Sequence, residues 1–252
     1  MPAGGRQLGV ARMRRIICAL SGAAVMSVEA VHAASCAPPP IGVWRGLYDA
    51  AQKPLPMRYE IQTTTDGKRI LLAKGAFNTN EPISLQNALA GAGRIDEVWL
   101  YSGGGSSAAG MGFGRILRTR GLAVRIPADA VCFSACSMAF LGGALRSIDP
   151  SGYYGVHMWS AWSDPKYSEE FIDKIFAYMN GAKDRAAATA FVRGQIQQVE
   201  IENADYARQR ANYLIEMSVS LRLMHPNTNT ASDSEYWICP AEARSFNVVN
   251  VY

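Results

Sequence analysis

The stretch that decides the fold is residues 131–140, which read Val-Cys-Phe-Ser-Ala-Cys-Ser-Met-Ala-Phe. It follows an apparent strand and runs into small and apolar residues, so Ser134 is predicted to open a helix. The free N–H groups and the positive dipole end of a first helical turn favour negative charge. Ser134 is therefore the candidate nucleophile, and the backbone N–H of Ala135 is a candidate donor to an oxyanion.

Strands and helices alternate on both sides of this stretch. A hairpin of strands 57–63 and 69–76 is predicted first, around the turn Thr65-Asp-Gly-Lys68. Further strands are predicted at 95–101, 122–126, 146–148, 153–157 and 236–240, and helices at 82–89, 108–120, 169–179, 186–199 and 204–224. This alternation predicts an α/β fold with a parallel sheet, in which active sites lie at the carboxyl ends of the strands.

Two more segments at predicted strand ends carry chemistry. The loop Ser102-Gly-Gly-Gly105 follows one strand, and glycine lets the backbone approach a ligand closely. Gly104 is the candidate for a second oxyanion donor. Of the three histidines, His32 falls in the N-terminal segment and His225 stands at a predicted helix end, which leaves His157 as the candidate base.

These three segments carry a resemblance to a known family. Ser102-Gly-Gly-Gly105, the run from Cys132 through Ser134 to Gly143, and Gly155-Val-His157 resemble the oxyanion-loop, nucleophile and base segments of the ClpP/crotonase superfamily. The similarity is strongest to exported ClpP-like proteins. The resemblance implies stacked βαβ units, a Ser-His-Asp triad and peptide hydrolysis. The family loop has a proline where this chain has Gly103.

The resemblance also bears on the third member of the triad. In the family it precedes a segment similar to Tyr236-Trp-Ile-Cys-Pro-Ala-Glu-Ala243. That alignment places the acid on Asp233, with Glu235 as the alternative. A solvated loop aspartate is an equally good interpretation of Asp233. A Ser-Lys dyad is a further alternative, for which Lys166 is the candidate.

The N-terminus predicts export. Arg12, Arg14 and Arg15 precede an apolar run, and Val31-His-Ala33 ends it, so residues 1–33 have the layout of a signal peptide. An uncleaved membrane anchor is the alternative. Residues 34–56, rich in proline, are predicted to be extended rather than helical, and the ClpP-like domain is assigned to residues 57–252.

The net charge and the cysteines indicate which partners and which cellular compartment the protein is expected to have. Cleavage removes four of 25 basic and one of 21 acidic residues, and the remaining net charge of +1 argues against nucleic acid. Four cysteines remain, of which we favour a Cys36–Cys239 disulfide and predict Cys132 and Cys136 as buried free thiols. No Cys/His cluster has metal-ligand spacing, so neither a metal nor a cofactor is expected.

The leading interpretation is an exported ClpP-like serine hydrolase, periplasmic or extracellular, that acts on peptides or unfolded chains. An inactive ClpP-like scaffold that binds a partner through a helical insert at residues 169–224 is the alternative. Crotonase-type chemistry on a thioester is a third interpretation. A homo-oligomer is compatible with the apolar residues of the insert, and membrane contact is expected only if the N-terminal segment stays uncleaved.

Overall fold

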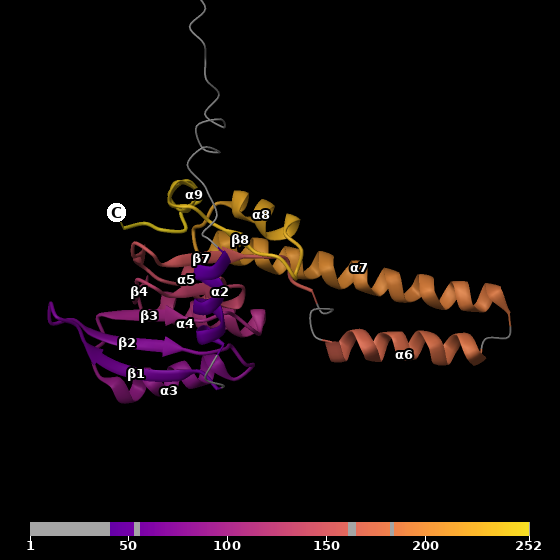
Figure 1. Ribbon diagram of the computed structural model, residues 1–252, viewed down its shortest axis with the longest axis horizontal. Helices are drawn as coiled ribbons and strands as arrows, with labels where there is room; N and C mark the ends of the chain where they lie inside the picture. The colour runs from indigo at the N-terminus through magenta and orange to yellow at the C-terminus, as the bar shows by residue number, and fades with distance from the viewer. Residues whose placement is uncertain (1–40, 53–55, 161–164, 182–183, 252) are drawn as a thin grey trace, which may run out of the picture.

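The computed structural model describes residues 41–52, 56–160, 165–181 and 184–251. The predicted signal peptide and Cys36 lie outside these ranges. Within them, the strands and helices alternate as far as His157, and helices dominate after it (Figure 1). The elements in chain order are α2 Ile41–Ala51, β1 Arg58–Thr63, β2 Arg69–Lys74, α3 Glu81–Ala92, β3 Glu97–Tyr101, α4 Ser107–Thr119, β4 Ala123–Ile126, β5 Val131–Phe133, α5 Ala135–Leu141, β6 Arg146–Ile148, β7 Tyr153–Val156, α6 Pro165–Gly181, α7 Arg185–Glu216, the 3₁₀ turn η2 Leu221–Leu223, α8 Met224–Asn229, β8 Tyr236–Trp237 and α9 Pro240–Ser245.

The strands form two sheets. The larger has the order β1-β2-β3-β4-β6, and every pair in it is parallel except the β1–β2 hairpin. The smaller has the order β5-β7-β8, with β5 parallel to β7 and β8 antiparallel. A parallel bridge between Ser102 and Cys132 joins the end of β3 to β5. The α/β class with a mostly parallel sheet, predicted from the alternation, is confirmed.

Helix α5, which follows the candidate nucleophile, lies deep in the core, because α4 packs against it through glycine. All seven of its residues are buried. A Cβ at Gly110 would collide with the carbonyl of Ala135, and one at Gly142 would collide with the backbone of Gly114. These missing side chains let the two helices approach closely, which fixes the start of α5 relative to the loop before α4.

The structure corrects our prediction for residues 34–56. We predicted an extended chain, but Ile41–Ala51 forms helix α2. The prolines of the segment fall outside the helix, at positions 38–40, 54 and 56, so none of them removes a hydrogen bond within it. Trp44 is buried against Trp237, with ring centroids 5.4 Å apart, and Tyr48 packs on Phe133. The helix therefore covers the smaller sheet beside the site.

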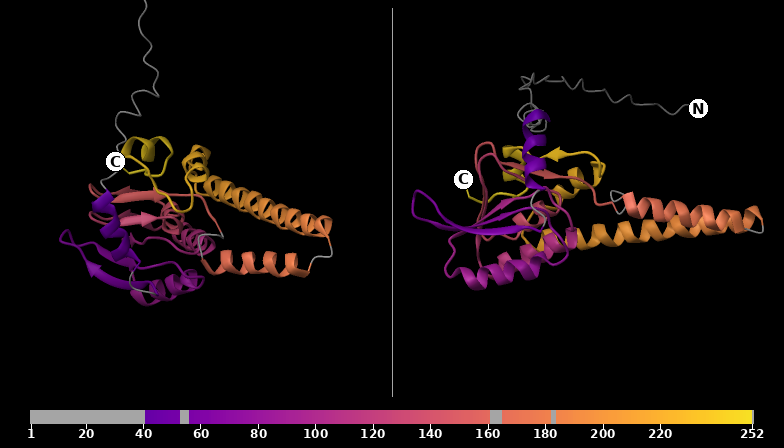
Figure 2. Two further views of the ribbon diagram at one scale, coloured as in Figure 1. Left: turned by 45° about the vertical axis from the view of Figure 1, so that its right-hand side comes forward. Right: turned by 60° about the horizontal axis from the view of Figure 1, so that its bottom comes forward.

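The C-terminal helices also differ from the prediction. We expected two helices, 186–199 and 204–224, but α7 is one helix of 32 residues that ends at Glu216, and His225 lies inside α8 rather than at a helix stop. Helices α6 and α7 extend together away from the α/β body, and the views of Figures 1 and 2 agree on this arm. Only the last turns of α7 are buried, at Arg210, Tyr213 and Leu214. None of the helices in the described part of the chain is long and apolar enough to span a membrane.

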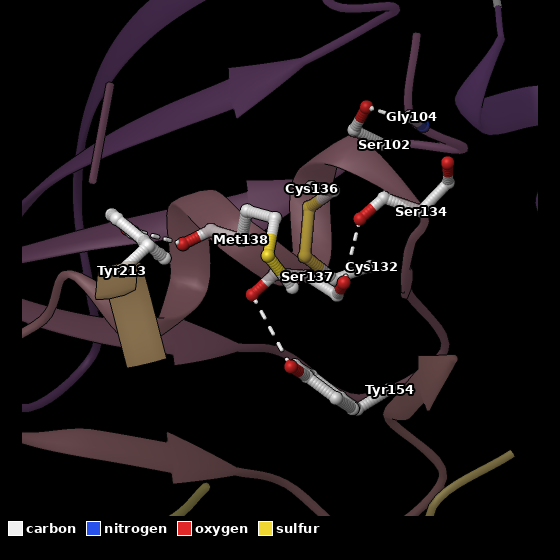
Figure 3. Close-up of a disulfide and its surroundings, with 9 residues drawn as sticks. All are labelled: Ser102, Gly104, Cys132, Ser134, Cys136, Ser137, Met138, Tyr154 and Tyr213. Atoms are coloured by element: carbon white, nitrogen blue, oxygen red, sulfur yellow. Dashed lines mark hydrogen bonds between the residues drawn. A yellow bond between two sulfur atoms is a disulfide. The ribbon is translucent and has the colours of Figure 1, made fainter. Parts of the chain in front are cut away.

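The cysteines near the nucleophile are a further correction. We predicted Cys132 and Cys136 as free thiols because a bridge within one helical turn is sterically demanding, but they form a disulfide with Cα atoms 5.1 Å apart. The two residues do not share a helical turn: Cys132 is the middle residue of β5, and Cys136 lies in α5, with a sharp bend at Ser134 between them (Figure 3). Cys239 is disulfide-bonded too, and its predicted partner Cys36 lies outside the described residues.

Candidate active site

Ser134 occupies a strained turn between β5 and α5. Its φ is 57° and its ψ is −118°, a conformation that a residue with a side chain adopts at a cost of about 1–3 kcal/mol. Several bonds hold it there: its N–H donates to the carbonyl of Gly155 at 3.2 Å, and its carbonyl accepts from the hydroxyl of Ser137 at 2.6 Å (Figure 3). The Cys132–Cys136 disulfide closes the same turn from both sides. The bend directs the Ser134 side chain into a pocket rather than along the helix.

His157 stands directly after β7, the strand that pairs with β5 in parallel. Its Nε2 lies 2.6 Å from the Ser134 Oγ, which is hydrogen-bond distance. The imidazole stacks on Phe133, with ring centroids 4.7 Å apart, so its orientation is fixed by packing as well. The structure therefore brings together the predicted nucleophile and the predicted base, which are 23 residues apart in sequence.

The other ring nitrogen of His157 has an unexpected partner. Nδ1 lies 2.8 Å from the backbone carbonyl of Ser232, a contact that requires a proton on Nδ1. Nε2 is then free to accept the proton of the Ser134 hydroxyl. The loop that carries Ser232 is itself held near the site, because the N–H of Met158 donates to the carbonyl of Thr230 at 2.8 Å.

The structure does not place the predicted acid on the base. Asp233 and Glu235 are both exposed, and among the described residues no carboxylate is hydrogen-bonded to His157. Asp233 instead accepts a hydrogen bond from the hydroxyl of Ser234 at 3.3 Å. The resemblance left the register of this loop open by one or two residues, and in the structure a main-chain carbonyl fills the position. A carbonyl fixes the tautomer as a carboxylate does, but it stabilises the charged imidazole less.

Burial sets the protonation state of His157. It lowers the pKa of the imidazole below its ordinary value of 6.5, the hydrogen bond to Ser232 opposes this, and the positive charge of Arg210 lowers the pKa further. With its pKa below 6.5, the ring is predominantly neutral at pH 7. A neutral imidazole with Nε2 facing a hydroxyl can act as a general base.

One of the two predicted oxyanion donors needs correction. The N–H of Gly104 donates to the Ser102 hydroxyl at 3.1 Å, so this group is already engaged (Figure 3). Gly104 still needs to be glycine, because a Cβ there would meet the Ser134 side chain at 2.7 Å. The backbone N–H groups of Gly105 and Ala135, by contrast, have no acceptor among the described residues. Gly105 lines the pocket of Ser134 and takes the place of Gly104 as the second candidate donor.

The pocket itself is small and polar. It has a volume of about 90 Å³, and its lining includes Gly105, Ser107, Ser134, His157, Ser160 and Arg210. Arg210 was missed by our sequence analysis. Its signal was available: Arg210 is a charged residue one turn from Tyr206 and from Tyr213 on the apolar face of the predicted helix, and a charge on a buried face needs an explanation.

The remaining candidates lie elsewhere. The side chain of Lys166, the alternative base, is outside the described part of the chain. His225 is exposed and bonds to Asn229, its Nε2 lying 3.0 Å from the side-chain amide nitrogen. Among the described residues no group of three His, Cys, Asp or Glu side chains gathers as metal ligands do.

Comparisons with known proteins give likenesses of fold. No protein-family model matches the chain, and no curated protein does. Solved structures that are similar include a ClpP1 mutant from Listeria monocytogenes, with 14% identity, 72% of this chain and 88% of that one covered, and a TM-score of 0.42. A mutant of the membrane-bound stomatin-specific protease 1510-N has 16% identity, coverages of 72% and 76%, and a TM-score of 0.34. A protein described as an enoyl-CoA hydratase from Streptomyces coelicolor A3(2) has 12% identity, coverages of 86% and 69%, and a TM-score of 0.34.

Proposed function

We propose that the protein is a ClpP-like serine hydrolase that cleaves peptide bonds. The observation that carries the proposal is the 2.6 Å contact between the Ser134 Oγ and the Nε2 of a neutral, oriented His157. In the proposed reaction, Ser134 attacks the substrate carbonyl while His157 takes its proton. The N–H groups of Ala135 and Gly105 receive the oxyanion, and the imidazolium then protonates the leaving amine. Water completes the cycle by hydrolysing the acyl-enzyme.

A fluorophosphonate probe tests this proposal, because it reacts with activated serines only. We expect the folded protein to be labelled at Ser134 and to cleave unstructured peptides. Ser134→Ala and His157→Ala should each lower peptide hydrolysis by at least about 10⁴-fold without unfolding the protein. An exposed serine such as Ser245, changed to alanine, is the matched control. Folded wild-type protein that neither reacts with the probe nor cleaves peptides would refute the proposal.

The proposal includes export of the mature chain. The layout of residues 1–33 supports it, and so does the Cys132–Cys136 disulfide, since such bonds persist in oxidising compartments. We expect a mature N-terminus at residue 34 in the periplasmic or extracellular fraction, as measured by mass spectrometry of the isolated protein. Recovery of the full-length chain from the reducing cytoplasm would contradict this part.

A specific observation favours a second role, binding through the helical insert. The arm exposes apolar side chains on both helices, among them Ile172, Phe176, Met179, Ile196 and Ile201. A hollow of about 420 Å³ also lies on the arm and is lined by Val192, Ile196 and other residues, with no nucleophile–base pair in it. Apolar surface of this kind is used for assembly, so we include a homo-oligomer in the proposal. Sedimentation of the mature chain measures it.

A further inference from the structure

Arg210 is a buried cation with an unused donor. Only 4% of its surface is exposed, and its Nε has no hydrogen-bond partner among the described residues. It takes part in no ion pair within the described part of the chain either. Burying a guanidinium without a counter-charge costs several kcal/mol. A buried donor that has no partner among the described residues and faces a pocket indicates a binding site for an anion.

The position of Arg210 shows where such a partner would sit. Arg210 lines the same pocket as Ser134 and His157, and its charge is close enough to lower the pKa of the His157 ring. It comes from the last, buried turns of α7, one turn after Tyr206, whose ring stacks on Trp159 of the pocket at 4.8 Å. An anion on Arg210 would therefore be held beside the reactive hydroxyl.

We propose that Arg210 binds a carboxylate of the substrate next to the scissile bond. This inference rests on the proposed peptidase function, because the anions of an unmodified peptide are carboxylates. The planar guanidinium matches a carboxylate with two parallel hydrogen bonds. The pocket, with a volume of about 90 Å³, has room for such a group. The carboxylate has two sources in a peptide, the C-terminus and an acidic side chain, and they predict different cleavage patterns.

Four pentapeptides separate the two sources. One pair has neutral side chains and ends in a free carboxylate or an amide; the other pair is amidated and carries Glu or Gln at its centre. If the C-terminal carboxylate is the group bound, we expect kcat/KM of wild-type protein to be about 10- to 100-fold higher for the free acid than for the amide. If the acidic side chain is the group bound, the same difference should separate the Glu peptide from the Gln peptide. In Arg210→Met that ratio should fall to about 1, and in Arg210→Lys, which keeps the charge and loses the fork, it should be intermediate.

Arg208→Met is the matched control, because Arg208 lies on the same helix with its side chain 64% exposed. It should keep the wild-type ratios. Circular dichroism establishes that each variant is folded. If wild-type protein cleaves all four peptides with ratios near 1, the inference is wrong while the proposed function stands.

A binding measurement separates the inference from the chemistry. The Ser134→Ala variant does not hydrolyse the peptides, so their binding can be measured by calorimetry. In the pair that shows the kcat/KM difference, the carboxylate peptide should bind more tightly than its neutral match. Adding Arg210→Met should remove that difference. Equal affinities for acid and neutral peptide would overturn the inference. Absence of both labelling and hydrolysis in wild type would instead remove the proposed function.

Discussion

The two ends of α5 each have a buried arginine, and the two arginines are used in opposite ways. Arg146, beyond the C-terminal end, donates to four carbonyls, those of Leu141, Gly143, Val248 and Asn247, at 2.8–3.2 Å. Arg210, in the pocket at the N-terminal end, has no hydrogen-bond partner for its Nε within the described part of the chain. Both side chains are at least 96% buried. Burial alone therefore does not separate a structural cation from a functional one, whereas the presence or absence of acceptors does.

The electrostatics of the two sites agree with this division. Burial lowers the pKa of Arg146 to about 10, helped by the nearby charge of Arg118, and burial lowers the pKa of Arg210 as well. Carbonyl dipoles compensate the first charge and tie the C-terminal segment to the core. The second charge has no ion-pair partner among the described residues, although the Tyr206 hydroxyl raises its pKa slightly, and it faces the pocket where a substrate would lie.

The largest expected effect separates the two arginines by stability. Arg146→Met removes the arginine donor from the carbonyls of Gly143, Val248 and Asn247, while Leu141 keeps its bond from Arg118, and the change should lower the free energy of unfolding by about 3 kcal/mol. Among the described residues no acceptor loses a hydrogen bond in Arg210→Met, so this variant should change the free energy of unfolding by less than about 1 kcal/mol or raise it. Urea denaturation of both variants measures the difference. Equal losses would show that Arg210 is structural, against our inference.

A second effect concerns what holds the N-terminal end of α5, where no arginine clamps the chain. The double variant Cys132→Ala/Cys136→Ala opens a very short disulfide loop and should lower the free energy of unfolding by about 2 kcal/mol. Because the bridge spans the strained Ser134, labelling of Ser134 should slow even where the protein is fully folded. Pairing the labelling rate with denaturation distinguishes the two losses. Unchanged labelling would mean that the hydrogen bonds to Gly155 and Ser137 suffice.

A third, smaller effect is a shift in pH dependence. Peptide hydrolysis should fall as pH drops through the pKa of His157, which burial holds below 6.5. The charge of Arg210 also lowers that pKa, so Arg210→Met should raise it and move the acidic limb of kcat/KM toward higher pH. Arg208→Met should leave the limb in place. A profile of Arg210→Met that superimposes on the wild type would place the Arg210 charge away from the base.

The sequence was sufficient where side chains and periodicity carry the information. Strand–helix alternation predicted the sheet, and a serine at a helix start, followed by a histidine at a strand end, predicted the Ser134–His157 pair. Main-chain groups carry no such signal. The Ser102 hydroxyl accepts the N–H of Gly104 and leaves that of Gly105 available. The orientation of this hydroxyl is set by the folded loop and cannot be predicted from the sequence.

The disulfide was missed for a related reason. Four-residue spacing excludes a bridge only if both cysteines lie in one helix, and the bend at Ser134 removes that condition. The prediction for α7 was also wrong. Polar residues between two apolar segments predicted a break near residue 200, but α7 is continuous there, because an exposed helix needs no apolar residue at that point.

The smallest expected effect concerns the group that accepts a hydrogen bond from Nδ1 of His157. If Nδ1 bonds to the carbonyl of Ser232, then Asp233→Asn and Glu235→Gln should leave kcat/KM and its acidic limb unchanged. Conversion of a triad carboxylate to its amide costs about 10⁴-fold in kcat, because the wrong tautomer is then favoured. The two outcomes are so far apart that a single steady-state assay decides between them. A large loss in Asp233→Asn alone would mean that the loop turns this side chain onto the base when substrate binds. That would restore the triad that the resemblance implies and make the carbonyl contact a feature of the free protein.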